Sequence, residues 1–177
     1  MAALNILAPL QKIEYGEKFN TYSHAVGGCV SLVGALLLLA IAVIKQDPTR
    51  LIAFFIYSIT TVGLYFVSAL YHGSSGSHKN FLRHLDYLGI YLKIAGNYTP
   101  YALIALSGLS QIYILITVWS LALFGVCWEL LTKSKIRAIS FATYGVMSIS
   151  VIPVLRDLIQ SIPPLGFTMI LMGYISY

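Results

Sequence analysis

Residues 51–71 read LIAFFIYSITTVGLYFVSALY, a run without a single Asp, Glu, Lys or Arg. A helix of about 20 apolar residues is long enough to cross the roughly 30 Å hydrocarbon core of a bilayer. It also satisfies its own backbone hydrogen bonds, which that environment requires. The run therefore predicts a transmembrane helix.

Working outward, apolar runs of similar length lie on both sides of this helix. Further full spans are predicted at residues 24–44, 85–106, 111–131 and 138–155. Pro163 and Pro164 suit a helix start, but the run that follows, residues 165–177, is too short to cross. The predicted fold class is all-α: a polytopic transmembrane helical bundle with five full spans and a partial sixth, within which the chain ends.

The composition of the chain supports the same class. Hydrophobic residues make up 58% of it and charged residues 10%, against about 25% charged residues in a soluble domain. A chain of 177 residues cannot hide this much apolar surface in its own core, so we expect a bilayer to cover it. No repeat or second domain is visible, and residues 1–177 are predicted to form one domain. The net charge of +5 is scattered rather than gathered into a basic stripe, so we expect no nucleic-acid partner.

Loop charges predict the orientation of the bundle. The N-terminal segment and the loops after the second and fourth spans hold seven cations, against three on the opposite side. By the positive-inside rule, residues 1–22 then form a cytoplasmic segment. The seven are Lys12, Lys18, Lys79, Arg83, Lys133, Lys135 and Arg137, and the three are Lys45, Arg50 and Arg156.

Ionisable residues in predicted spans are costly and usually mark function. Ser68 and His72 are four residues apart and share one helix face. Asp86 opens the third span, and the topology places it beside His72 at the cytoplasmic side. An imidazole, a carboxylate and a hydroxyl meeting there suit zinc and a water molecule that it activates. The simpler readings are that Ser68 bonds to its own helix, His72 lies at the interface and Asp86 favours its helix N-terminus.

Glu17, Asn20 and His24 step by three and four residues, so they form one stripe on a helix that leads into the first span. Farther along, Pro100 interrupts the third span. Its ring clashes with the carbonyl of Gly96, four residues back, and this predicts a kink.

Three ordered motifs lie between residue 14 and the end of the chain. Residues 17–24 read EKFNTYSH, residues 68–72 read SALYH, and residues 82–91 read LRHLDYLGIY, with AGNYTP at 95–100. They resemble the Glu-x-x-Asn-x-x-Ser/Thr-His opening pattern, the Ser-x-x-x-His signature and the third-helix block of the hemolysin III family. That family is grouped with the progestin and adiponectin receptors and the alkaline ceramidases.

The resemblance implies a seven-helix bundle with its amino end in the cytoplasm, in the inner membrane if the source is a bacterium. It also implies zinc held by three histidines. His72 would be a metal ligand, Asp86 and Ser68 the catalytic carboxylate and its polar neighbour, and Glu17, Asn20 and His24 the opening motif that supports them.

The chain departs from the family pattern in two places. First, the other two family histidines belong to a His-x-x-x-His motif on the seventh helix, and this chain ends within its sixth span. Second, Tyr87 stands where a histidine commonly follows the aspartate. We therefore expect a truncated sequence rather than a naturally short member. Zinc is expected in the full-length family fold and weakly or not at all in this chain, because tight sites use three or four protein ligands.

Three functions stay open at this point, and catalysis is undecided among them. One is membrane lipid homeostasis or sensing, one is zinc-dependent hydrolysis of a lipid amide, and one is pore formation by a membrane-damaging hemolysin. A pore would carry polar stripes along whole spans, whereas polarity here gathers at one end. This favours a membrane protein with a metal site whose partners are membrane lipids. The oligomeric state is not indicated.

Overall fold

The computed structural model describes residues 13–14, 16–132 and 137–175, and within them it contains helices and no β-strand. The predicted all-α class is therefore confirmed. The α-helices are α1 Lys18–Ile44, α2 Pro48–Gly73, α3 Ser77–Pro100, α4 Gly108–Leu131, α5 Arg137–Ile149, α6 Leu155–Ser161 and α7 Pro164–Ile175. Two short segments, the π-helix η2 (Tyr101–Ala105) and the 3-10 helix η3 (Ile152–Val154), follow α3 and α5.

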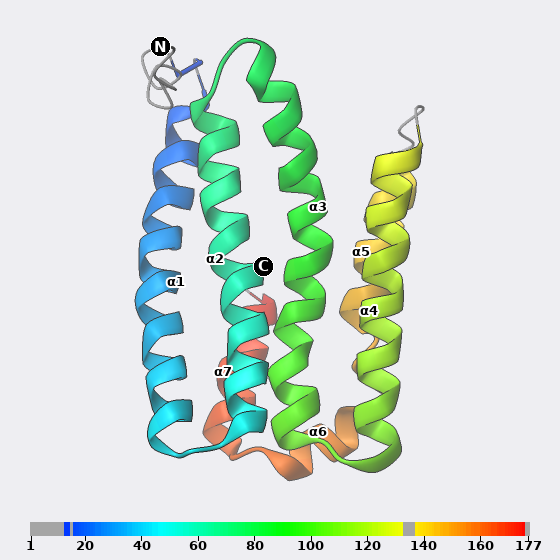
Figure 1. Ribbon diagram of the computed structural model, residues 1–177. Helices are drawn as coiled ribbons and strands as arrows, with labels where there is room; N and C mark the ends of the chain where they lie inside the picture. The colour runs from blue at the N-terminus through cyan, green and yellow to red at the C-terminus, as the bar shows by residue number, and fades with distance from the viewer. Residues whose placement is uncertain (1–12, 15, 133–136, 176–177) are drawn as a thin grey trace.

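Successive long helices run in alternating directions (Figure 1). The start of α1, the α2–α3 connection, the end of α4 and the start of α5 lie at one end of the bundle, the upper end in Figure 1. The α1–α2 and α3–α4 connections and α6 lie at the other end. The described residues that border the three segments predicted to share one side of the membrane thus lie at one end of the molecule. That this end faces the cytoplasm remains a prediction from charge.

Helices α2 and α3 begin earlier than predicted because turn-forming residues build their first turns. The Asp47 carboxylate accepts a hydrogen bond from the backbone N–H of Arg50 at 3.0 Å, and Pro48 fills the first helical position. The connection between the predicted spans 51–71 and 85–106 is shorter than these bounds imply, since α3 already starts at Ser77. Gly76 precedes it with φ of +76°, a conformation open to glycine, and the turn closes within a few residues.

Helix α3 packs closely against both neighbours through glycine. A Cβ on Gly96 would lie 2.0 Å from Oγ1 of Thr60 in α2, and one on Gly125 of α4 would lie 2.1 Å from the ring of Tyr91. Small residues at such contacts let membrane helices approach closely. These positions set the spacing of the α2–α3–α4 core.

At Pro100, where a kink is predicted, the helical geometry changes. The α-helix gives way to η2, which ends with a hydrogen bond from the Leu106 N–H to the Tyr101 carbonyl at 3.0 Å. One residue before the proline, the Thr99 hydroxyl donates to the Ala95 carbonyl at 2.9 Å. It also accepts from Nε1 of Trp119 in α4 at 3.2 Å. The irregular end of α3 is thereby tied to α4.

The fifth predicted span, residues 138–155, is interrupted. Helix α5 ends at Ile149, η3 contains Pro153, and α6 continues past Arg156 to Ser161. Proline lacks the backbone N–H that an uninterrupted helix would use here. Taken together, Arg137–Ser161 is still long and apolar enough to cross a membrane.

Four helical stretches among the described residues have that length and hydropathy: Lys18–Ile44, Pro48–Gly73, Gly108–Leu131 and Arg137–Ser161. Helix α3 is outside this set and carries Lys79, Arg83, Asp86 and Lys93, which lower its hydropathy. The apolar stretch Pro164–Gly173 in α7 is shorter. A transmembrane helical bundle is confirmed, whereas α3 as a full span and α7 as a partial sixth remain predictions.

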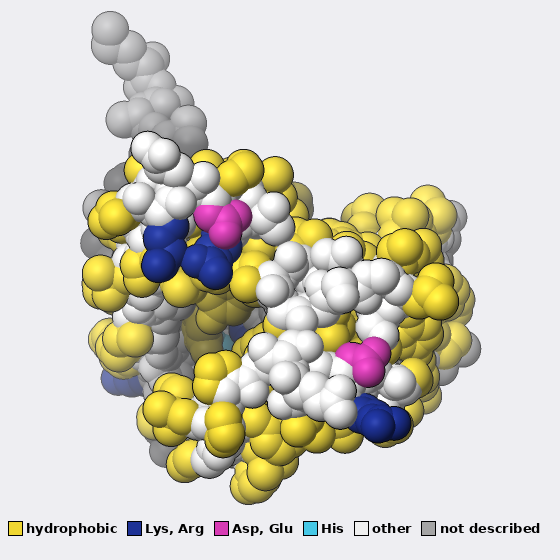
Figure 2. Space-filling view, turned by 90° about the horizontal axis from the view of Figure 1, so that it is seen from below, with side chains coloured by type: hydrophobic (Ala, Val, Ile, Leu, Met, Phe, Trp, Pro, Cys, Tyr) yellow, Lys and Arg dark blue, Asp and Glu magenta, His cyan; other side chains and the backbone are white. Residues whose placement is uncertain are grey.

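The outer surface of the bundle is apolar. Large hydrophobic side chains such as Val30, Leu36, Ile59 and Leu123 are exposed, while the buried core is centred on Tyr91 and its neighbours in α3, α4 and α5. Figure 2 looks along the bundle from the α6 end and shows mostly hydrophobic atoms, a few charged side chains and a hollow between them. A surface of this kind suits lipid as solvent.

Candidate functional site

The first contact of the site joins α2 to the start of α1. Nδ1 of His72 lies 2.6 Å from Oε2 of Glu17, and the Asn20 side-chain amide donates to the same oxygen at 3.4 Å. The hydrogen bond from His72 is the main cause that holds the pKa of Glu17 below its ordinary value of 4.5. Since the ionised carboxylate can only accept, His72 donates from Nδ1. Its Nε2 is then the nitrogen that can carry a lone pair.

The His24 ring covers His72. The two ring centroids are 5.4 Å apart and the planes differ by 3°, so the rings are stacked. Tyr65, about two turns before His72 in α2, lies against His24 with a centroid distance of 6.0 Å. Glu17, Asn20 and His24 thus lie along α1 on the side that meets His72, as the predicted stripe requires.

A pair of charged residues closes the outer edge of the site. Nζ of Lys79, at the start of α3, lies 2.6 Å from a Glu14 carboxylate oxygen and 3.7 Å from Oε1 of Glu17. The hydrogen bond to Glu14 raises the pKa of Lys79. The N-terminal segment, α2 and α3 are therefore connected through charge at this end of the bundle.

Ser68 and Asp86 lie deeper and are almost fully covered, with exposed fractions of 4% and 8%. The Ser68 hydroxyl interacts with the Asp86 carboxylate, and His72 and His24 are close enough to act on that carboxylate electrostatically. The structure therefore gathers all six predicted residues around the junction of α1, α2 and α3. Within the described chain, Asp86 has no ion pair with Lys93, although that lysine is seven residues on in the same helix.

The donor set tests whether these residues suit zinc. A histidine that binds a metal usually donates its second ring N–H to a carboxylate or carbonyl, and Glu17 accepts from His72 in this way. Across residues 13–14, 16–132 and 137–175, no group of three His, Cys, Asp or Glu side chains is arranged to hold a metal ion. The residues present fit one oriented ligand rather than a complete coordination shell.

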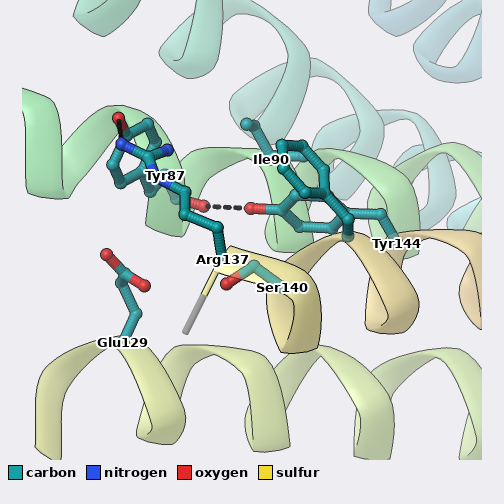
Figure 3. Close-up of a pocket in the computed structure, with 7 residues that line it drawn as sticks. Tyr87, Ile90, Glu129, Arg137, Ser140 and Tyr144 are labelled. Atoms are coloured by element: carbon teal, nitrogen blue, oxygen red, sulfur yellow. Dashed lines mark hydrogen bonds between the residues drawn. The ribbon is translucent and has the colours of Figure 1, made fainter. Parts of the chain in front are cut away.

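A second polar cluster lies on the other side of α3 and was not predicted as a site. Arg137 donates from Nη2 to the Tyr87 hydroxyl at 2.6 Å, and the Tyr144 hydroxyl donates to the Tyr87 carbonyl at 3.4 Å (Figure 3). Glu129 of α4 is 6% exposed, with Oε1 3.8 Å from Nδ1 of His84. The available signal was Glu129 itself, a carboxylate inside the predicted fourth span.

Apolar helices long enough to cross a bilayer, joined to a polar site at one end, define a polytopic helical membrane protein. Comparison with known families and proteins then gives its relatives. The family model "Haemolysin-III related" matches residues 14–177, and the chain belongs to that family.

Two curated relatives cover most of the chain. The "Hemolysin-3 homolog" of Bacillus subtilis (strain 168) is 30% identical over 162 residues, which are 91% of this chain and 76% of the relative. "Hemolysin-3" of Bacillus cereus is 28% identical over 162 residues, 91% of this chain and 74% of that protein. No solved structure matches the chain. The predicted resemblance to the hemolysin III family is thus confirmed.

Proposed function

We propose that this integral membrane protein of the hemolysin III type carries part of a zinc site at the cytoplasmic end of its bundle, with His72 as the ligand. The observation that supports it best is the 2.6 Å contact between Glu17 Oε2 and His72 Nδ1. That contact keeps a proton on Nδ1 and orients the ring, so Nε2 is the ligating atom.

The other residues of the site have separate roles in this proposal. Asn20 and Lys79 help to hold the Glu17 carboxylate in place, and His24 covers the His72 ring. Asp86, beside the Ser68 hydroxyl, is the carboxylate that orients a water molecule. Bound zinc would supply Lewis-acid activation of that water. Because only His72 is placed as a ligand, we expect weak zinc binding by these residues alone and tight binding in a complete seven-helix fold.

The role that we propose is membrane lipid homeostasis or sensing, with membrane lipids as partners. It is supported by the contrast between the polar end of the bundle and the apolar outer faces of α1, α2 and α4. A pore-forming role, which the relatives' names suggest, would instead predict dye release from vesicles that contain the purified protein.

A zinc-dependent lipid amide hydrolase is the second candidate. The observation that favours it is the buried Asp86 carboxylate beside Ser68, since a general base must lie close to the water it activates. Hydrolysis would appear as release of a fatty acid from an amide-linked lipid, and Asp86→Asn would abolish it.

Metal analysis of purified protein tests the zinc proposal. The 177-residue chain and any longer product of the same reading frame are purified without added chelator, and zinc per chain is measured in wild type, His72→Ala and His78→Ala. His78 is the matched control because it is exposed and outside the site. Zinc should fall in His72→Ala and not in His78→Ala. Stoichiometric zinc that survives His72→Ala would show that the site lies elsewhere.

A further inference from the structure

Lys93 is a half-buried cation in the middle of the bundle, and among the described residues it forms no hydrogen bond or ion pair. It lies sixteen residues after Ser77, the start of α3, and twelve before Ala105, the end of η2. At 1.5 Å per residue the nearer end is roughly 18 Å away, farther than a lysine side chain extends. Ionisable residues at such a depth face the interior of a bundle or a water-filled cavity.

The contacts of α3 with α2 show the level at which Lys93 lies. A Cβ on Gly89 would lie 2.7 Å from Cδ1 of Leu64, and one on Gly96 would meet Thr60. The two helices run in opposite directions (Figure 1). Lys93, between the two glycines, is therefore at the level of the single turn of α2 that Thr60 and Leu64 enclose.

Polar residues recur along the two helices with the same spacing. Thr61 is seven residues before Ser68, and Lys93 is seven residues after Asp86. Seven residues are nearly two helical turns, so Thr61 and Lys93 lie on the faces that carry the Ser68–Asp86 contact. Asn97 follows one turn after Lys93 on the same face. Polar side chains thus extend from the Ser68–Asp86 contact into the middle of the bundle.

Two of these side chains are buried without a protein partner. Oγ1 of Thr61 and Oδ1 of Asn97 have no hydrogen bond within the described chain, and Thr61 is only 5% exposed. Hydroxyls in membrane helices commonly bond to their own helix, as neighbouring Thr60 does with the Ile56 carbonyl at 2.8 Å. A buried polar group without a protein partner is costly unless water reaches it. Water both donates and accepts, so it suits a hydroxyl, an ammonium and an amide oxygen together.

We infer that Thr61, Lys93 and Asn97 line a hydrated crevice that admits small anions in preference to cations. The Ser68–Asp86 contact, with exposed fractions of 4% and 8%, closes its inner end. The crevice opens toward the α6 end, where Figure 2 shows a hollow with basic side chains at its depth. Lys93 provides the selectivity, because a charge in a cleft with apolar walls concentrates ions of the opposite sign.

The crevice gives water a route to Asp86. That use rests on the proposed function, in which Asp86 orients a water molecule, whereas the crevice itself is tested without metal.

Thiol accessibility in lipid nanodiscs, where the reagent reaches both faces of the bilayer, tests the crevice. In the full chain without Cys29 and Cys127, single cysteines replace Asn97 or Leu92, and their rates of reaction with charged methanethiosulfonate reagents are measured. Leu92 is the matched control, because it lies in the same helix and is 38% exposed on the outer surface. Asn97→Cys should react at least about tenfold faster, since apolar surroundings that raise the pKa of a thiol by one unit lower its thiolate fraction tenfold. Equal rates would overturn the crevice.

The charge of Lys93 gives a second measurement. Asn97→Cys should react preferentially with an anionic reagent over a cationic one, and Lys93→Gln should lower the ratio of the two rates about tenfold. Lys45→Gln is the matched control, because Lys45 is an exposed lysine at the end of α1, and it should leave the ratio unchanged. A ratio that stays the same in Lys93→Gln would overturn the assignment of the selectivity to Lys93.

Two further arms keep the test decisive. Should Asn97→Cys fail to fold, Lys93→Cys is the second reporter and should also react faster than Leu92→Cys. In intact cells, an impermeant reagent should modify Asn97→Cys from the same side as Lys45→Cys, because the α1–α2 connection lies at the α6 end. Modification of Asn97→Cys only from the side on which Ser77→Cys reacts would overturn the placement of the opening.

Discussion

Glu17 and His72 are 55 positions apart in sequence, yet Oε2 of the first lies 2.6 Å from Nδ1 of the second. The contact joins the N-terminal end of α1 to the end of α2. It is the feature from which the proposed role of His72 follows, and it can be tested without any metal.

Replacing Glu17 with Gln should destabilise the bundle. The contact is partly covered, with exposed side-chain fractions of 18% for His72 and 25% for Glu17. A hydrogen bond of this type contributes about 1 kcal/mol, and we expect a loss of that order in the free energy of unfolding in detergent. Glu14→Gln is the control, because Glu14 is 53% exposed and pairs only at the edge of the site. Equal losses in both variants would argue against a special role for the Glu17 contact.

The same contact should make stability depend on pH. The pKa of Glu17 is lowered in the folded protein by the hydrogen bond from His72, from an ordinary value of 4.5. The stabilisation is therefore present above about pH 4.5 and is lost as the pH falls through the lower, folded pKa. Unfolding midpoints of wild type and Glu17→Gln should differ at neutral pH and converge in acid. A constant difference down to the most acidic pH at which the protein folds would contradict this assignment.

Gly96→Ala should destabilise the chain because α2 and α3 would have to separate. The new Cβ would meet Oγ1 of Thr60 at 2.0 Å and its Cβ at 2.9 Å, and the latter cannot move without the backbone. Overpacking of this kind costs about 1–3 kcal/mol.

Gly63→Ala is the matched control for this substitution, since nothing lies within 4 Å of a Cβ at that helical position. Alanine is favoured over glycine in helices by about 1 kcal/mol, so the control should be neutral or stabilising. Adding Thr60→Ala to Gly96→Ala should recover part of the loss. Thermal unfolding of the four proteins measures all three effects, and a neutral Gly96→Ala would show that the helices are less closely packed.

Cysteine labelling tests the orientation. In a variant that lacks Cys29 and Cys127, which are free and exposed, a cysteine at Asn5 or Ser77 should resist an impermeant thiol reagent in intact cells. One at Lys45, in the exposed α1–α2 connection, should react. Lys45 is used rather than Gln46, whose φ of 49° is unfavourable for a cysteine. Reaction at Asn5 and Ser77, with protection at Lys45, would reverse the predicted topology.

Periodicity and hydropathy predicted most of the bundle, because a bilayer imposes length and apolarity on each span. The same rules predicted that successive connections lie at alternating ends of the bundle, and that Glu17, Asn20 and His24 form one stripe. The early start of α3 did not, since it depends on the backbone conformation at Gly76, and the break after Ile149 depends on how Pro153 is accommodated.

The sequence predicted which residues lie near one another better than it predicted which side chains pair. Ser68, His72 and Asp86 were placed together by topology, but the bond from His72 to Glu17 requires the exact rotation of α1 against α2. Arg137 was read only as a loop cation, and its contact with Tyr87 depends on the approach of α5 to α3. Such contacts between distant segments leave no periodic signal in the sequence.

Helix α1 contains His24 and is preceded directly by Glu17, while much of its surface, including Val26, Val30 and Val33, faces outward. A helix of this length moves as a stiff rod, so a slide or tilt that displaces one of these contacts displaces the other with it. A membrane helix can tilt when its hydrophobic length differs from the thickness of the bilayer. A tilt of α1 would therefore move the group that orients the His72 ring and the ring that covers it at the same time.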